Sequence, residues 1–183
     1  MTLNNNYQKV AEQYLGNSYG NLYIRIYAKV NSQDENSLTS NVSYQSRLYY
    51  SGSSYIISQG QTKVITSGSG ATTTTTNWQN FEGTTTGRYN SGETVVKTIT
   101  GTVQHNEEGQ ASINTSAQFS SAGSWGWSGT ASGSADLPAI ETSTLRLGVN
   151  SEWKKATPYL GVNGEWKKCK AYLGVNNSWK KGV

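Results

Sequence analysis

Residues 21–30 read NLYIRIYAKV, and this stretch decides the fold. Apolar side chains occupy every second position: Leu22, Ile24, Ile26, Ala28 and Val30. The positions between them carry aromatic or charged side chains: Tyr23, Arg25, Tyr27 and Lys29. Successive side chains of a β-strand point to opposite faces, so a period of two is typical of a strand with one buried face and not of a helix. The stretch therefore predicts a strand of a sheet that covers a core on one side only.

Further short strands are predicted on both sides of this one. Segments rich in β-branched and aromatic residues, bounded by Gly, Ser or Asn, lie at residues 42–50, 54–60, 61–68, 93–104, 110–121 and 124–137. The Thr-rich segment 67–93 is either an exposed strand or a linker, because Thr suits a pleated surface. Only residues 4–15 have a helical pattern, and it is a weak one. Many short strands separated by turn residues predict an all-β protein, with an antiparallel β-sandwich of the Ig-like or jelly-roll-like kind over residues 1–141.

The composition indicates a folded chain whose interior depends on aromatic residues. Leu, Ile, Val and Phe contribute only 31 of the 183 residues, whereas 12 Tyr and 6 Trp add apolar area. The formal net charge of +4 is too low for disorder, which combines low hydrophobicity with high charge. The chain opens without the apolar run of a secretory signal, and it has no run of about 18 apolar residues that could span a membrane. We therefore expect a protein made in the cytoplasm, with no membrane insertion.

The net charge of the chain changes from negative to positive beyond Pro138. This proline also restricts the residue before it to extended geometry. Residues 1–141 carry 7 Lys or Arg against 9 Asp or Glu, and residues 142–183 carry 8 against 2. The change marks a boundary at about residue 141. A basic tail can meet phosphate, an anionic wall polymer or a membrane surface. Alternatively, its lysines keep an exposed sheet in solution and protect the sheet edges.

The tail contains three copies of a 13-residue repeat, in residues 147–181: LGVNSEWKKATPYLGVNGEWKKCKAYLGVNNSWKK. In the middle copy, Asn163-Gly164 predicts a type I′ hairpin turn, because both central positions of that turn need positive φ. This turn would place Gly161 opposite Trp166, so that the indole covers backbone without a side chain of its own. Asn150-Ser151 and Asn176-Asn177 stand at the same place in the other copies and favour the turn less strongly. We predict a small module of three β-hairpins over residues 142–183.

The candidate binding residues are the aromatic and basic side chains of these repeats: Trp153, Trp166, Trp179, Lys154, Lys167, Lys180, Tyr159 and Tyr172. One interpretation is a packing repeat, since a single hairpin is not stable alone in water and repeats bury their apolar faces by stacking. A second is a row of rings flanked by lysines that binds a cell-surface glycan or a teichoic-acid-like anion. The third is single-stranded nucleic acid, and it is the least favoured.

The residues show no constellation of an enzyme, so we predict no catalytic residue, no metal site and no cofactor. His105 is the only histidine and lies in a turn, where a hydrogen-bonding role is commoner than catalysis. Glu107 and Glu108 are adjacent and point to opposite sides of extended backbone, a poor arrangement for glycoside hydrolysis. Other acidic pairs, Asp34/Glu35 and Glu82/Glu93, fall in predicted loops. Cys169 is the single cysteine, which excludes an intrachain disulfide and the usual cysteine-based metal sites.

Residues 101–140 read GTVQHNEEGQASINTSAQFSSAGSWGWSGTASGSADLPAI. This segment resembles a pattern in minor structural proteins of tailed bacteriophages that infect Gram-positive bacteria. The matching positions are those of a tVxHNxdG-like turn and of an LPxI-like phrase: Val103, His105, Asn106, Gly109, Leu137, Pro138 and Ile140. Residues 36–50 also resemble a NxSxVxxxLxL strand of that family, and the Trp–Lys repeats look like those that end many phage tail and fibre proteins.

The resemblance implies a β-sandwich carried on the virion, at the tail tip, the baseplate or a fibre, and involved in assembly and host attachment. The implied partners are other virion proteins, further copies of the chain in a homo-oligomer, with a trimer as the expectation, and a bacterial surface glycan or teichoic acid. Two alternatives remain: a lectin-like glycan-binding module without an assembly role, and a decoration protein of the capsid surface.

Overall fold

The computed structural model describes residues 1–17, 20–52, 55–56, 62–77, 88–89, 92–121, 127–142, 145–149, 152–156, 158–169, 171–175 and 178–181. These residues form strands, turns and extended segments and no helix, so none of them belongs to a helix that could cross a membrane. The chain divides into two compact units, Met1–Ile140 and Glu141–Val183. The prediction of an all-β antiparallel sandwich is confirmed.

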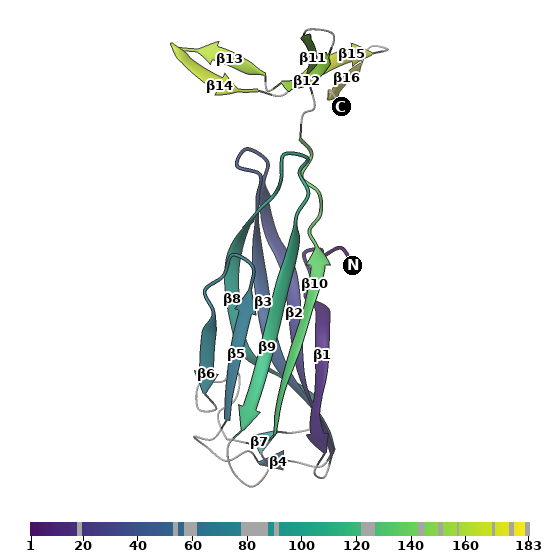
Figure 1. Ribbon diagram of the computed structural model, residues 1–183, viewed down its shortest axis with the longest axis vertical. Helices are drawn as coiled ribbons and strands as arrows, with labels where there is room; N and C mark the ends of the chain where they lie inside the picture. The colour runs from purple at the N-terminus through teal and green to yellow at the C-terminus, as the bar shows by residue number, and fades with distance from the viewer. Residues whose placement is uncertain are drawn as a thin grey trace. The chain divides into compact units, whose positions relative to one another are not determined.

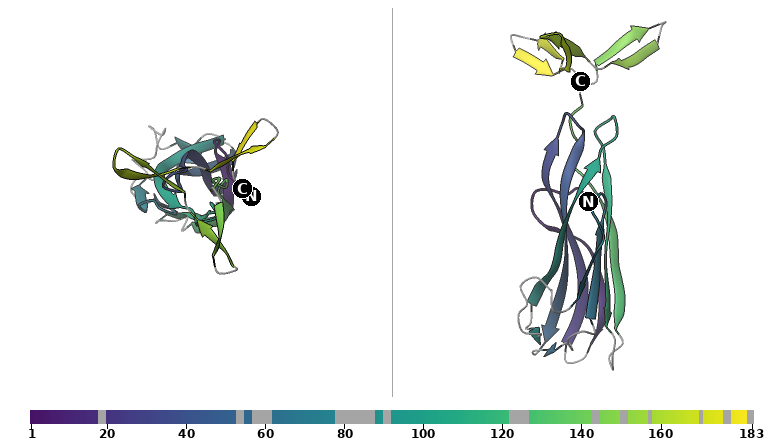
Figure 2. Two further views of the ribbon diagram at one scale, coloured as in Figure 1. Left: turned by 90° about the horizontal axis from the view of Figure 1, so that it is seen from above. Right: turned by 90° about the vertical axis from the view of Figure 1, so that its left-hand side faces the viewer.

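Two four-stranded antiparallel sheets form the sandwich (Figures 1 and 2). The first has the order β1 (Gln8–Asn17), β2 (Gly20–Asp34), β3 (Thr39–Gly52) and β8 (Gly92–Gln104). The second has the order β10 (Ser128–Asp136), β9 (Ser112–Ser121), β5 (Thr62–Gly68) and β6 (Thr74–Asn77). A separate short pair joins β4 (Tyr55–Ile56) to β7 (Arg88–Tyr89). The Thr-rich segment is thus a strand over Thr74–Asn77, and much of its remainder lies outside the described residues.

The core lies between the two sheets and is mainly aliphatic. Strand β2 points its five alternating apolar residues inward, and all five are buried: Leu22, Ile24, Ile26, Ala28 and Val30. Among the described residues, the buried aromatic side chains are Tyr44, Tyr50 and Phe119. Where the structure describes the core, aliphatic side chains therefore outnumber aromatic ones, and the expected dependence of the interior on aromatic residues is not seen there. Tyr23 and Tyr49 lie on the opposite, outer side of the same sheet, because they follow the polar phase of the alternation.

Residues 4–15 are not helical: most of them belong to β1, which pairs with β2. The ladder has register shifts between Lys9 and Ala11 and between Tyr14 and Gly16. Each β-bulge inserts one extra residue into β1, which disturbs the period of two and leaves apolar residues at spacings close to those of a helix. The segment is a strand because it pairs with β2, and the local sequence pattern does not show that pairing.

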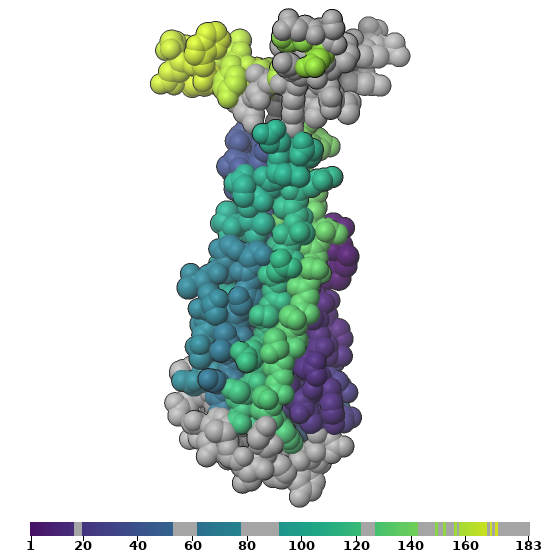
Figure 3. Space-filling model, in the orientation of Figure 1, coloured from purple at the N-terminus to yellow at the C-terminus, as the bar shows by residue number. Residues whose placement is uncertain are grey.

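Strand β1 also lies beside β10 of the other sheet (Figure 3). A methyl group added to Gly129 of β10 would come within 2.6 Å of Leu15 Cδ2, and one added to Gly133 within 3.1 Å of the Val10 carbonyl oxygen. The two glycines therefore allow the sheets to approach closely along this side.

The segment that leaves the sandwich is fixed by hydrogen bonds. Ile140 donates its backbone N–H to the Gly109 carbonyl at 2.9 Å, and Gln33 Nε2 donates to the Pro138 carbonyl at 2.8 Å. Ile140 itself is 3% exposed. The sandwich thus holds the chain up to the last residue of its unit.

The second unit contains three two-stranded antiparallel sheets. They pair β11 (Leu145–Val149) with β12 (Glu152–Ala156), β13 (Tyr159–Val162) with β14 (Glu165–Lys168), and β15 (Tyr172–Val175) with β16 (Ser178–Lys181). Each corresponds to one copy of the sequence repeat.

Candidate functional site

The three Trp–Lys repeats adopt the same strand register. A glycine lies opposite the tryptophan in every copy: Gly148 opposite Trp153, Gly161 opposite Trp166, and Gly174 opposite Trp179. The preceding leucine lies opposite a lysine in every copy: Leu147 opposite Lys154, Leu160 opposite Lys167, and Leu173 opposite Lys180. The register predicted for the middle copy from its Asn-Gly turn is confirmed.

The middle repeat shows why its turn and its glycine are required. Asn163 and Gly164 have φ of 52° and 83°, the positive values that the predicted turn demands. The indole of Trp166 lies 3.8 Å from the position that a Cβ of Gly161 would occupy. The ring therefore covers the backbone of the facing strand. Beyond the open end of the hairpin, the Cys169 N–H donates to the Pro158 carbonyl at 2.9 Å.

The middle repeat exposes apolar side chains on both of its faces. Trp166 is 78% exposed and lies on the same face as Tyr159, which is 55% exposed. Leu160 lies on the other face and is 59% exposed, with exposed Lys167 opposite it. Side chains of this size on a two-stranded sheet bury no core of their own, which indicates a surface that contacts something else.

The remaining candidate residues are placed by backbone only. Trp153 and Lys154 lie on β12, Tyr172 on β15, and Trp179 and Lys180 on β16. Their side chains lie outside the described part of the molecule, as do the turns at 150–151 and 176–177.

A second candidate site lies on the outer face of the sheet formed by β1, β2, β3 and β8. Cross-strand pairing places Tyr14 beside Tyr23 and Tyr23 beside Tyr49 in one row. The next row along the strands pairs Arg25 with Arg47. We call this surface the tyrosine–arginine face and define it by eleven residues: Tyr7, Lys9, Glu12, Tyr14, Tyr23, Arg25, Tyr27, Lys29, Arg47, Tyr49 and Glu93.

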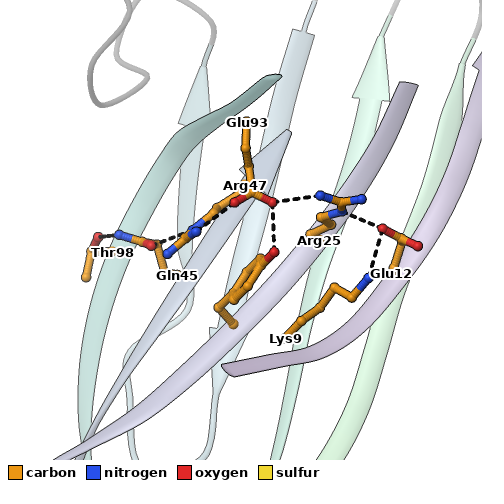
Figure 4. Close-up of polar contacts among 8 residues, drawn as sticks. Lys9, Glu12, Arg25, Gln45, Arg47, Glu93 and Thr98 are labelled. Carbon is orange, nitrogen blue, oxygen red and sulfur yellow. Dashed lines mark hydrogen bonds and ion pairs between the residues drawn. The ribbon is translucent and has the colours of Figure 1, made fainter. Parts of the chain in front are cut away.

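Two carboxylates compensate the like charges of the facing arginines (Figure 4). Arg25 lies between the two glutamates. Its Nε donates to Glu12, and its Nη1 donates to Oε1 of Glu93 at 3.0 Å. Glu93 also accepts from Arg47 at 2.7 Å and from the Tyr27 hydroxyl at 2.8 Å. Like charges directly opposite on neighbouring strands are destabilising, so this sheet depends on the two glutamates.

The arginines also stack on tyrosine rings. The guanidinium of Arg25 lies 3.9 Å from the ring centre of Tyr49, and that of Arg47 lies 4.1 Å from the ring centre of Tyr27. The ammonium of Lys29 lies 4.9 Å from the ring centre of Tyr7. Cation–π contacts of this kind are attractive and, together with the ion pairs, fix the orientation of the rings.

The network shifts the pKa values of its acidic members. Burial alone would raise the pKa of Glu93, but the hydrogen bonds from Arg47, Arg25 and Tyr27 outweigh it and hold the pKa below its ordinary value. The pKa of Glu12 is lowered in the same way, because bonds to Arg25 and Lys9 outweigh the effect of burial. Burial and the bond to Glu93 raise the pKa of Tyr27. At neutral pH Glu12 and Glu93 are therefore ionised, and the Tyr27 hydroxyl keeps its proton.

Sequence reasoning did not identify this face as a site. It placed the alternating residues of β2 on the outer side, but it assigned Glu93 to a loop and Glu12 to a weakly helical segment. Glu93 lies on β8, and Glu12 on β1. The signal in the sequence was the unbroken series of aromatic and cationic residues at outward positions of β2. The residues that contact this series, Glu12 and Glu93 among them, are brought to it by the pairing of four strands.

The structure does not bring His105 and Glu93 together. His105 is 4% exposed; its Nδ1–H donates to the Gly109 carbonyl at 2.8 Å, and its Nε2 lies 2.7 Å from the Ser40 hydroxyl oxygen. The carbonyl can only accept, so Nδ1 carries a proton in this contact, and both ring nitrogens have a partner. Glu93 lies at the other end of β8, and Glu82 lies outside the described residues. Among the described residues, no cluster of His, Cys, Asp and Glu is suited to a metal ion.

No family model, curated protein or solved structure matches the chain.

Proposed function

We propose that this chain is a non-enzymatic structural protein of a bacteriophage virion, part of the tail tip, baseplate or a fibre, with a role in assembly and in attachment to the host surface. The sandwich of residues 1–140 is the scaffold, and the three Trp–Lys hairpins are the contact elements. The observation that carries this proposal is the 78% exposure of Trp166 on a hairpin whose register recurs in two other copies. The resemblance of the sequence to phage minor structural proteins supports the virion setting.

The charge of the hairpin unit favours an anionic contact. Residues 142–183 carry 8 Lys or Arg against 2 Asp or Glu. A bacterial surface polymer that combines sugar rings with phosphate groups offers both an apolar face to the indole and a negative charge to the lysines. Three equivalent hairpins on one chain, multiplied in a homo-oligomer such as a trimer, convert weak single contacts into high avidity.

The test uses the full chain and purified cell walls of a Gram-positive bacterium. One variant replaces Trp153, Trp166 and Trp179 by alanine, and a matched variant replaces all three by tyrosine. We expect the alanine variant to lose roughly tenfold or more in wall affinity, about 1.4 kcal/mol or more, because it loses the exposed rings. The tyrosine variant keeps a ring at each position and retains most of the binding.

Two results would contradict parts of the proposal. Undiminished wall binding by the alanine variant would exclude attachment through the hairpins. Absence of the wild-type protein from purified particles, assayed by mass spectrometry, would exclude a virion role. An alanine variant that binds walls normally but fails to enter particles would assign the hairpins to assembly alone.

A further inference from the structure

We propose that the tyrosine–arginine face is a second binding surface, carried by the sandwich itself, and that its ligand is an anionic polysaccharide chain. This inference goes beyond the proposed role of the hairpins, since it concerns a different unit of the chain and other residues.

The face presents a continuous row of aromatic rings. The ring centres of Tyr14 and Tyr23 are 5.3 Å apart, and those of Tyr23 and Tyr49 are 6.0 Å apart. Tyr14 is 44% exposed, on the outermost strand of its sheet. A sugar ring packs its C–H groups against such a ring, while the tyrosine hydroxyl is available to the sugar's own hydroxyl groups. The row therefore suits a chain of sugars that crosses the strands.

The polar groups beside the row are held in place before any ligand arrives. Arg25 is paired with Glu12 and Glu93 and stacks on Tyr49. Arg47 is held by Glu93 and by Gln45, whose Oε1 lies 2.6 Å from the arginine Nε. Ordering a long side chain at an interface costs conformational entropy, and a preformed arrangement avoids that cost. Such pre-organisation is typical of a binding surface.

The other sheet of the sandwich forms without such a surface. The second sheet has the same number of strands, and small polar residues line a shallow hollow of about 410 Å³ on it, among them Ser67, Asn114, Ser116, Ser132 and Ser134. Lys63 and Asp136 are the charged residues of its described strands. Figure 3 shows this face, over β5, β9 and β10. In the described parts of the two four-stranded sheets, the outward-facing tyrosines and both arginines therefore lie on the face of β1, β2, β3 and β8.

Charge identifies the class of ligand. The tyrosine–arginine face carries four cationic side chains, Lys9, Arg25, Lys29 and Arg47, against the carboxylates of Glu12 and Glu93. The sandwich unit has only seven Lys or Arg in total, and its remaining residues are net acidic. A symmetric dimer through this face would set like charges against each other, because both copies use the same patch. A glycan bearing phosphate or carboxylate groups has the complementary sign.

The test isolates this face from the hairpins. The background is the full chain with Trp153, Trp166 and Trp179 replaced by alanine, and the probes are a hexose-substituted glycerol-phosphate polymer and neutral dextran. We expect the background variant to bind the anionic polymer and to bind dextran more weakly, with an affinity for the anionic polymer that falls as salt is raised. Adding Tyr14→Ala and Tyr23→Ala should reduce binding roughly tenfold or more. Gln118→Ala, on the outer face of β9, is the matched control and should have no effect.

Each outcome decides the proposal. Absence of polymer binding in the background variant overturns it and leaves the role of the hairpins intact. Unchanged binding by the double tyrosine variant, or equal binding of dextran and the anionic polymer, overturns it as well. A change in oligomeric mass by light scattering without a change in polymer binding would make the face an interface between copies and refute the glycan assignment. Should the double variant lose its circular dichroism signal, Tyr14→Ala alone, at the exposed edge position, decides by the same criterion.

Discussion

Replacing Glu93 by glutamine removes the charge that holds Arg25 and Arg47 together. The carboxylate accepts three hydrogen bonds, from two arginines and Tyr27, and its side chain is 22% exposed. A hydrogen bond to a charged group contributes about 1.5–3 kcal/mol. Solvent screening reduces these values, and the amide oxygen of glutamine still accepts, so we expect a net loss of about 2 kcal/mol in the free energy of unfolding. The melting temperature should fall by roughly 7 °C.

The pH dependence gives the same experiment a second readout. The pKa of Glu93 is lowered in the folded protein, so its contribution is present above the ordinary glutamate pKa of about 4.3 and is lost as pH falls through the lowered folded value. Wild type and Glu93→Gln should therefore differ in stability at pH 7, and the difference should shrink as pH falls below the ordinary glutamate value. Urea denaturation followed by circular dichroism over this pH range measures the difference.

The control for this prediction is Glu165→Gln, which makes the same chemical change on an exposed residue of the other unit. It should leave the unfolding of the sandwich unchanged. A Glu93→Gln variant within about 0.5 kcal/mol of wild type at pH 7 would show that the ion pairs contribute no more than an ordinary surface pair. A difference that does not diminish as the pH is lowered through the acid range would refute the electrostatic origin.

Two further substitutions test the core and the turn. Gly68→Ala would place a methyl group 2.5 Å from the buried ring of Tyr44, and we expect a loss of about 1–3 kcal/mol in urea denaturation, with no loss refuting the close contact. His105→Ala would remove one hydrogen bond from the Ser40 hydroxyl and one from the Gly109 carbonyl, which keep their bonds from Gln33 and from the Ile140 N–H. We expect a loss of about 2 kcal/mol and faster amide exchange in the turn after β8, and unaltered exchange would contradict this anchoring role.

The strand pattern of the sandwich could be read from the sequence where pairing leaves the period of two intact. Strand β2 keeps strict alternation from Leu22 to Val30, and each of its inward residues is buried. Strand β1 could not be recognised, because its two register shifts destroy the local pattern. Local periodicity reports a strand only when the strand has no β-bulge near the residues that face the core.

The two candidate sites also differ in how far they could be predicted from local sequence. The register of the middle hairpin follows from Asn163-Gly164 alone, because a two-residue turn fixes which residues face each other. The tyrosine–arginine face depends on how four strands align, and Glu93 is 68 residues away from the arginine it joins to the network. A long-range alignment of this kind has no local signature. Only the aromatic and cationic residues at the outward positions of β2 hinted at it.

The pairing of β10 has a mechanical consequence. This strand is paired with β9 along all nine of its residues, and the chain continues from its end through Pro138 and Ile140. The bonds between antiparallel strands run perpendicular to the strand direction. Tension applied to the chain beyond residue 140 and transmitted along β10 therefore loads these bonds together in shear, instead of opening them one after another as a zipper would.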